Sequence, residues 1–473
     1  LLRKQCYIDG QWVGEPALAV TNPATGAEIA KVPLMSAKQT QDAITAAERA
    51  FPAWSKMLAK DRSKILRNWF DLMIEHADEL ALLMTMEQGK PLAEAKGEVV
   101  YAASFIEFFA EEAKRINGET IPTFKDGARV ICIKQPIGVV AAISPWNFPA
   151  AMITRKAGPA LAVGCTMVVK PASETPLTAL ALAELGERAG IPKGVFNVIT
   201  GKASVVGPVL TGSPVVRMLT FTGSTEIGKV LIEQCAKTVK KVGMELGGNA
   251  PFIVFDDADL DKAVEGAMAS KYRNAGQTCV CANRLYVQDA VYDKFAEKLS
   301  VAVKKLKVGD GAGTGVTTGP LINAAAIAKI EEHIEDAVKK GAKVTLGGKR
   351  HMLGGNFFEP TILTGVTQAM KVAREETFGP VAPLFRFKTE EEAIRLANDT
   401  EFGLAAYFYA RDIGRVWRVG EALEYGIVGI NEGIISSEVV PFGGVKESGL
   451  GREGSHHGTE EFLEIKYMLM GGL

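Results

Sequence analysis

Apolar residues in the first third of the chain recur at helical spacing. They return every three to four positions through 43–50 and 65–73, which predicts two amphipathic helices. Two more helices are predicted over 78–88 and 92–116, because each run ends at a glycine-bearing stop signal. The amino-terminal third is therefore expected to be mainly helical.

The period of the pattern changes after residue 129. Short runs typical of buried strands then alternate with helical stretches, first from 130 to 235 and again from 252 to 431. Such alternation indicates parallel sheets covered by helices. Residues 461–467 alternate between apolar and polar, which predicts a lone strand. That strand must pair elsewhere, and a second subunit is one partner it could have.

Composition places the chain among ordinary globular proteins. Of 473 residues, 47% are hydrophobic and 23% are charged, and the formal net charge is −1. Nucleic-acid binders usually carry a basic excess, so no nucleic acid is expected as a partner. The longest uncharged apolar stretch, 157–169, is too short to cross a bilayer, so no membrane span is expected.

The cysteines and histidines indicate neither a disulfide framework nor a metal site. Six cysteines are too few to staple a chain of this length, so a reducing compartment, the cytoplasm, is expected. A cleaved organellar transit peptide stays open as an alternative. None of the five histidines shares a helix turn or short loop with a cysteine at metal-ligand spacing, so no metal is expected.

Two glycine-rich segments imitate nucleotide-binding motifs. The segment 223–230 nearly matches a P-loop, but Val230 stands where the Mg²⁺-binding Ser or Thr should be. Its strand-turn-helix context still suits a dinucleotide phosphate at a helix N-terminus. The segment 449–454 reads G-x-G-x-x-G without a strand before it, which predicts a turn-rich loop.

Three residues in turns are candidates for chemistry. Cys279 ends a polar, glycine-bearing turn, where a thiol is either a nucleophile or a small buried apolar residue. Glu245 comes just before two glycines, as a general base or as a solvated strand end. Asn147 follows a strand, where its amide either donates to an oxyanion or belongs to a rigid proline turn.

Seven short motifs together resemble the aldehyde dehydrogenase superfamily over essentially the whole chain. They follow the family's order and spacing: PWNFP at 145–149, KPA at 170–172, FTGS at 221–224, ELGG at 245–248, GQTC at 276–279, ETFGP at 376–380 and PFGG at 441–444. The resemblance implies a homo-oligomer, a dimer or a tetramer. It also implies an α/β fold with a Rossmann-like nucleotide-binding domain (1–119 and 143–252), an α/β catalytic domain (253–459) and a β-arm for oligomerisation (120–142 and 460–473).

By position in these motifs, the resemblance implies the chemistry of an aldehyde oxidation. Cys279 is the nucleophile, and Asn147 with the backbone N–H of Cys279 holds the oxyanion. Glu245 activates the water that hydrolyses the resulting thioester. The nicotinamide cofactor is expected to contact Ser144, Pro145, Trp146, Lys170, Ser173, Phe221, Gly223, Ser224, Leu246, Glu376 and Phe378.

The residue after the KPA motif bears on the choice of cofactor. NAD-preferring members of the superfamily commonly have a glutamate there, which bonds the adenosine 2′-hydroxyl, whereas this chain has Ser173. A carboxylate would repel a 2′-phosphate, and a hydroxyl beside Lys170 would accept it. NADP is therefore the expected cofactor, with NAD as the alternative if Glu174 turns inward.

The segment 279–281 and two loops after residue 430 resemble the succinate-semialdehyde branch of the superfamily. The resemblance to that branch implies that Arg155, Arg273 and Ser436 bind the distal carboxylate of the substrate. The alternative for each arginine is a surface or interface salt bridge with no role in substrate binding. The expected reaction is oxidation of succinate semialdehyde to succinate with NADP. Glutarate semialdehyde or another short ω-carboxy aldehyde is an alternative, because one methylene is worth only about 1–3 kcal/mol. A catalytically retired binding protein is the alternative of another class.

Cys281 raises a regulatory hypothesis. It lies two residues from Cys279, and under oxidation the pair could form a strained, easily reduced disulfide that silences the enzyme. The alternative is a second buried thiol.

Overall fold

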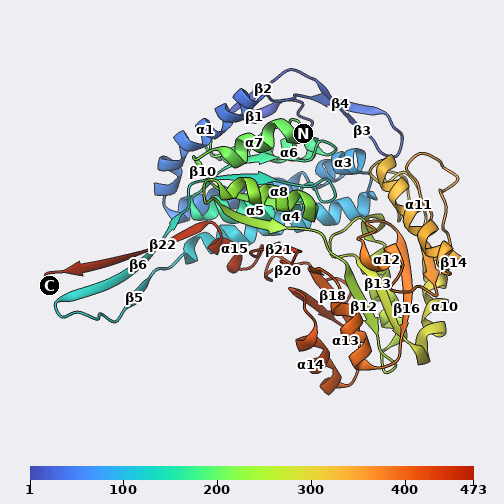
Figure 1. Ribbon diagram of the computed structural model, residues 1–473. Coiled ribbons are helices and arrows are strands. Elements are labelled where there is room, and N and C mark those ends of the chain that lie inside the picture. The colour runs from blue at the N-terminus through green and yellow to red at the C-terminus, as the bar shows by residue number, and fades with distance from the viewer.

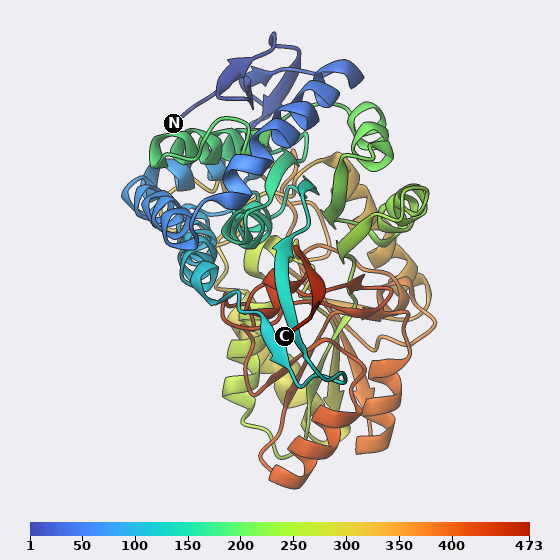
Figure 2. The ribbon, with the colours of Figure 1, turned by 90° about the vertical axis from the view of Figure 1, so that its left-hand side faces the viewer.

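The computed structural model describes residues 1–473, which form two α/β units and a projecting arm (Figure 1). Each unit is built on one sheet that is mainly parallel. The α/β fold class is therefore confirmed. Viewed from the side of the arm, the first unit lies above the second, and the arm lies at the level of their junction (Figure 2).

The first unit contains an eight-stranded sheet in the order β2-β1-β9-β8-β7-β10-β11-β21. Its five central strands run parallel, and short antiparallel strands close both edges. The strands are β1 (Cys6–Ile8), β2 (Gln11–Val13), β7 (Val139–Ile143), β8 (Thr166–Lys170), β9 (Phe196–Val198), β10 (Val216–Thr222), β11 (Lys241–Glu245) and β21 (Gly449–Leu450).

Helices cover both faces of this sheet, so its central strands are apolar on both sides. On β8, Met167 and Val169 pack into the core beneath α2 to α6, and Val168 packs into the core beneath α1, α7 and α8. Every residue of α5 is buried. The helices are α1 (Ala37–Lys56), α2 (Ala59–Glu75), α3 (Ala77–Gln88), α4 (Leu92–Glu112), η1 (Ala113–Arg115), α5 (Ala151–Val163), α6 (Pro176–Ala189), α7 (Ala203–Gly212) and α8 (Thr225–Ala236).

The second unit contains a seven-stranded sheet in the order β14-β15-β16-β13-β12-β18-β19, in which only β14 is antiparallel. Its strands are β12 (Ala250–Val254), β13 (Ala282–Gln288), β14 (Lys343–Leu346), β15 (Thr361–Thr364), β16 (Val381–Phe387), β18 (Ala405–Tyr409) and β19 (Ile427–Ile430). Its helices are α9 (Leu260–Lys271), η2 (Arg273–Gly276), η3 (Asp289–Val291), α10 (Tyr292–Val303), α11 (Ala324–Lys339), α12 (Lys371–Arg374), α13 (Glu390–Asn398) and α14 (Ile413–Ala422).

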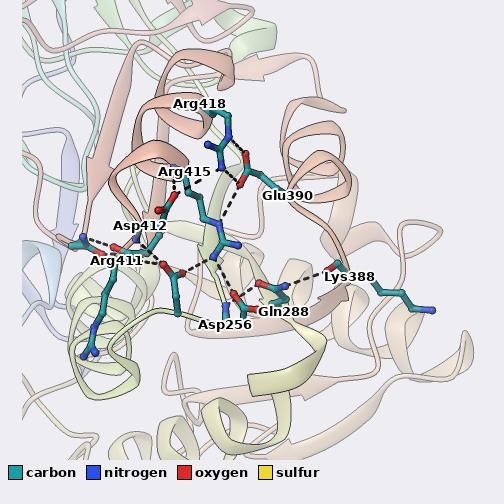
Figure 3. Close-up of polar contacts among 11 residues, drawn as sticks. Asp256, Gln288, Lys388, Glu390, Arg411, Asp412, Arg415 and Arg418 are labelled. Carbon is teal, nitrogen blue, oxygen red and sulfur yellow. Dashed lines mark hydrogen bonds and ion pairs between the residues drawn. The ribbon is translucent and has the colours of Figure 1, made fainter.

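A network of charged residues fastens α14 to the second unit (Figure 3). Arg415 donates to Asp256 at 3.0 Å, to Asp257 at 2.6 Å and to Glu390 at 3.2 Å. Arg418 donates to the same Glu390 at 2.7 Å. The network therefore ties α14 both to the start of α13 and to the segment that follows β12.

The arm is a three-stranded antiparallel sheet of β5 (Glu119–Ile121), β6 (Ala128–Pro136) and β22 (Leu463–Gly471). Strand β22 pairs with β6 over nine residues, so the terminal strand finds its partner within this chain rather than requiring a second subunit. The structure differs from the expected division at two boundaries. Residues 139–142, expected in the arm, belong to β7 in the middle of the eight-stranded sheet. Residues 250–252, expected in the nucleotide-binding domain, belong to β12 of the second sheet.

Several elements carry no periodic signal and were not predicted. Strands β1 and β2, the hairpin of β3 (Leu18–Thr21) and β4 (Glu28–Val32), and the ten-residue α7 are too short or too rich in glycine and proline. The other short elements are β17 (Phe402–Gly403), β20 (Val445–Lys446) and α15 (His457–Glu460). No helix combines the length and hydropathy needed to cross a membrane.

Candidate active site

Two depressions have Cys279 in their linings. The main cavity, of about 360 Å³, is lined by Pro145, Trp146, Asn147, Thr222, Gly223, Ser224, Leu246, Gly247, Cys279, Ile322, Asn323, Ala325, Ala326, Lys329, Glu376, Thr377 and Phe378. A smaller depression, here called the Tyr101 recess, is lined by Tyr101, Phe148, Met152, Arg155, Arg273, Thr278, Cys279, Val280, Ser436 and Phe442. Cys279 therefore lies between two depressions. A nucleophile in this position could contact one molecule bound in each depression.

A strained turn presents Cys279 to both depressions. After α9, Asn274 and Ala275 both have left-handed backbone, with φ of 50° and 53°. A Cβ on Gly276 would lie 2.1 Å from the carbonyl oxygen of Gly379, so only glycine fits there. Cys279 is partly exposed, and burial raises the pKa of its thiol to about 12. The thiol is therefore protonated at neutral pH and needs a base.

Asn147 lies in the turn that follows β7. Its side-chain Nδ2 donates to the carbonyl oxygen of Gln277 at 3.1 Å, and its Oδ1 has no hydrogen-bond partner. An amide nitrogen carries two hydrogens, so one remains for another acceptor. Because Gln277 is two residues before Cys279, this bond ties the asparagine to the nucleophile turn.

Glu245 ends β11 as a buried carboxylate without any hydrogen bond to either oxygen. Burial and the nearby charge of Glu453 raise the pKa of Glu245 to about 8. Its nearest cation is Arg155, whose Nη2 lies 4.0 Å from Oε2. A carboxyl with this pKa is mostly protonated at pH 7, and it acts as a general base in the ionised fraction, which grows as the pH rises through about 8.

Glu453 neutralises two cations on the buried helix α5. Its carboxylate forms ion pairs with Arg155 and Lys156, and all three side chains are largely buried. Sequence reasoning missed Glu453, because it lies in the 449–454 loop that was interpreted only as a turn. The signal was on α5: an Arg–Lys pair in an otherwise apolar, buried helix demands a counter-charge.

The Tyr101 recess brings together the three residues proposed for a distal carboxylate. Arg155, Arg273 and Ser436 line it together with Cys279. The Nη2 atom of Arg155 and the hydroxyl of Tyr101 are buried there without a hydrogen-bond partner. Unpaired buried donors are costly, so this recess is suited to an anion that accepts from them. Tyr101, on α4, was not among the predicted residues.

The main cavity contains most of the predicted cofactor residues. Pro145, Trp146, Gly223, Ser224, Leu246, Glu376 and Phe378 line it. Ser144, Lys170, Ser173 and Phe221 do not. Ser144 has a buried hydroxyl without a partner, and Lys170 donates to Pro171 at 3.1 Å. Ser173 is half-buried before α6, and the ring of Phe221 lies beneath Gly223.

The chemistry of the main cavity fits a dinucleotide. Ser224 caps the N-terminus of the twelve-residue α8, and a helix N-terminus favours a phosphate. Glu376 also lines this cavity. It accepts from the backbone N–H of Gly248 at 3.2 Å, and burial raises the pKa of Glu376 to about 7. The rings of Trp146 and Phe378 meet edge to face at 5.6 Å, which provides an aromatic wall.

Cys281 is buried and points away from both depressions. Its thiol donates to the carbonyl oxygen of Lys271 at 3.5 Å, and it lines neither the main cavity nor the Tyr101 recess. All six cysteines of the chain are free thiols.

The model of the aldehyde dehydrogenase family matches residues 12–468. The chain belongs to this family. The matched region includes Cys279, Glu245 and Asn147 and all seven of the motifs. The resemblance found in the seven motifs is therefore confirmed.

Among curated relatives of this aldehyde dehydrogenase is succinate-semialdehyde dehydrogenase [NADP(+)] GabD of Escherichia coli, 70% identical over 100% of this chain and 98% of that protein. A glutarate-semialdehyde dehydrogenase of Pseudomonas aeruginosa is 67% identical over 100% of this chain and 99% of that protein. Among solved structures, an NADP-dependent enzyme of E. coli superposes with a TM-score of 0.99 at 69% identity, covering 99% of this chain and 98% of that one.

Proposed function

We propose that this aldehyde dehydrogenase oxidises succinate semialdehyde to succinate with NADP. The observation that carries the proposal is the Tyr101 recess, where Arg155, Arg273 and Ser436 converge beside Cys279. Two arginines and a hydroxyl suit one carboxylate at the far end of a short aldehyde. The 70% identity to a relative named for this substrate and cofactor supports the proposal.

The residues divide the reaction between capture and hydrolysis. The sulfur of Cys279 forms a bond to the aldehyde carbon, and its proton passes to Glu245, whose pKa near 8 suits the task. The side chain of Asn147 and the backbone N–H of Cys279 hold the oxygen that becomes negative. Bound NADP⁺ would accept the hydride that leaves this carbon, which then becomes the carbon of a thioester. Glu245 passes its proton to solvent and deprotonates a water, whose oxygen attacks the thioester carbon. The carbon–sulfur bond breaks, the sulfur takes the proton back from Glu245, and the carboxylic acid leaves.

The loop before α6 supports NADP over NAD. Burial lowers the pKa of Lys170, and the charge of Glu174 opposes that shift, so Glu174 lies close enough to act on the lysine although it is exposed. The partly buried position is occupied by the hydroxyl of Ser173, which can donate to a 2′-phosphate. The ratio of kcat/KM for NADP to that for NAD is expected to exceed one by at least tenfold, and Ser173→Glu should reverse it. An unchanged ratio in Ser173→Glu would remove this residue from the cofactor site.

The deciding experiment compares aldehydes that differ in the distal group. With saturating NADP, kcat/KM for succinate semialdehyde should exceed that for neutral butanal at least a hundredfold, about 2.7 kcal/mol. Arg273→Met should erase most of that ratio, whereas Arg411→Met, at an exposed surface site, should leave it unchanged. A ratio under tenfold would contradict the substrate assignment and leave a general aldehyde dehydrogenase.

Glutarate semialdehyde belongs in the same series. Relatives at 67% and 68% identity are named for it, and one methylene is worth only about 1–3 kcal/mol in a pocket. If glutarate semialdehyde gives the higher kcat/KM, the longer substrate replaces the shorter in the proposal.

The arm is proposed as the surface for assembly of a homo-oligomer. Strand β22 is an edge strand, and Ile465, Tyr467 and Leu469 on one of its faces are 72%, 54% and 41% exposed. Ile465→Glu should convert a dimer or tetramer to monomers in light scattering after size exclusion, and unchanged mass would refute this role.

The six free thiols support a reducing compartment, the cytoplasm, as the location.

The domain division is also a proposal. The nucleotide-binding domain is proposed to include 139–249 together with the helical first third, and the catalytic domain to run from β12 at residue 250 to residue 459, apart from the short strand β21.

A further inference from the structure

Three polar residues lie four positions apart where α4 begins. Lys90 precedes the helix, and Glu94 and Glu98 lie in its first two turns. Positions 94 and 98 share one face of the helix. The Lys90 side chain reaches the same face, because its ammonium group pairs with Glu98. Lys90 and Glu98 are 2% and 4% exposed, although neither lines the main cavity or the Tyr101 recess. Here the three are called the α4 brace.

Two members of the brace hold the Asn147 turn. Glu98 accepts from the backbone N–H groups of Ala150 at 3.0 Å and Ala151 at 3.3 Å, where α5 begins. Lys90 forms an ion pair with Glu98 and donates to the carbonyl oxygen of Asn147 at 2.7 Å. The backbone is therefore bonded at Asn147 itself and three to four residues after it to side chains at the start of α4.

The third member holds the nucleophile turn. Glu94 accepts from the backbone N–H of Asn274 at 2.7 Å. The side-chain nitrogen of Asn274 in turn donates to the carbonyl oxygens of Asn147 at 3.1 Å and Gln277 at 3.2 Å. Asn274 has left-handed backbone, which costs free energy and must be held in place by its surroundings.

The brace therefore links two turns that come from different units of the molecule. A buried ion pair contributes little net stability compared with apolar residues of the same size, so stability alone does not explain charges here. Catalysis is sensitive to geometry, and a shift of about 1 Å in a reacting group can cost about a hundredfold in rate.

We propose that Lys90, Glu94 and Glu98 are positioning residues that set the separation between the Asn147 amide and the Cys279 thiol. The proposal rests on the proposed function only for the roles of Asn147 and Cys279, and it is independent of which aldehyde is oxidised. It assigns to α4 a part in transition-state geometry that neither depression reveals.

Glu94 offers the cleanest test, because its glutamine variant keeps an oxygen acceptor for Asn274. Glu94→Leu should lower kcat about 10- to 100-fold for succinate semialdehyde and for butanal alike, with the Kd for NADP unchanged within about twofold. Glu94→Gln should retain kcat within about threefold. Glu111→Leu, on the exposed face of the same helix, is the matched control.

A double-mutant cycle separates positioning from a general loss of structure. If Glu94 acts through Asn147, adding Glu94→Leu to Asn147→Ala should cost less than about threefold in kcat. The proposal is overturned if Glu94→Leu costs the same factor with Asn147 as without it, or if Glu94→Gln is as slow as Glu94→Leu. A failure of the semialdehyde assignment would appear instead as equal kcat/KM for the two aldehydes, with the Glu94 effect intact.

Discussion

Replacing Glu453 by glutamine should shift the pH dependence of the reaction downward. Glu453 raises the pKa of Glu245 to about 8 together with burial, while Arg155 lowers it. At the 4.0 Å between Arg155 and Glu245 and an effective dielectric of about 20, the arginine is worth about 4 kcal/mol to the carboxylate, or about three pKa units. In the native protein the charge of Glu453 cancels much of that attraction.

The base must be deprotonated to act, so activity should rise with pH through about 8 in the native enzyme. In Glu453→Gln the rising limb of kcat/KM against pH should move to 7 or below. The melting temperature should fall too, because removing one partner of a buried ion pair costs about 3–5 kcal/mol. The control is Glu461→Gln. Glu461 is a half-buried carboxylate that lines a small depression together with Glu245 and Glu453, but its charge is not among those that shift the pKa of Glu245. If the midpoint of the rising limb of kcat/KM against pH stays at about 8 in Glu453→Gln, the charge of Glu453 does not control the pKa of Glu245 in this way.

Three further outcomes are expected. Cys279→Ala should abolish aldehyde oxidation while leaving the Kd for NADP within about threefold, and residual turnover above 1% of the native rate would remove the thiol from the chemistry. Arg415→Met should lower the free energy of unfolding by about 1–3 kcal/mol, since Asp256, Asp257 and Glu390 each lose one ion pair, with kcat/KM unchanged. Cys281→Ser should resist reversible inactivation by mild peroxide if the Cys279–Cys281 disulfide forms; equal inactivation of both proteins, measured with thiol counts, would end that hypothesis.

The long periodic elements of this fold were readable in the sequence, and the pairings between distant segments were not. Helices such as α2 and α11 have clear apolar faces, and β8 is a continuous apolar run. Strand β22 showed its alternation but not its partner, because β6 lies more than 300 residues earlier in the chain. Nothing in a local pattern specifies such a contact.

The candidate site divides in the same way. Cys279, Glu245 and Asn147 each stand in a short motif with a recognisable turn, so local reading found them. Tyr101 and the α4 brace lie in or just before a helix that contains no recognisable motif. Their proposed roles depend on which distant residues α4 contacts, and the sequence does not show those contacts. Glu453 lies within a glycine pattern that predicts only a turn-rich loop, and this local pattern gives no sign that its carboxylate pairs with cations on α5.

The pairing of Glu453 with Arg155 and Lys156 bears on the order in which the molecule folds. Arg155 and Glu453 are 298 residues apart, and contacts of such long separation are slow to form. Until the 449–454 loop docks, the two cations of the first unit would have Glu245, 4.0 Å from Arg155, as their remaining counter-charge, and α5 would keep water around them. During folding, the environment that shifts the pKa of Glu245 is therefore expected to form in one late step, when Glu453 docks. Refolding followed by activity should lag behind refolding followed by helix content.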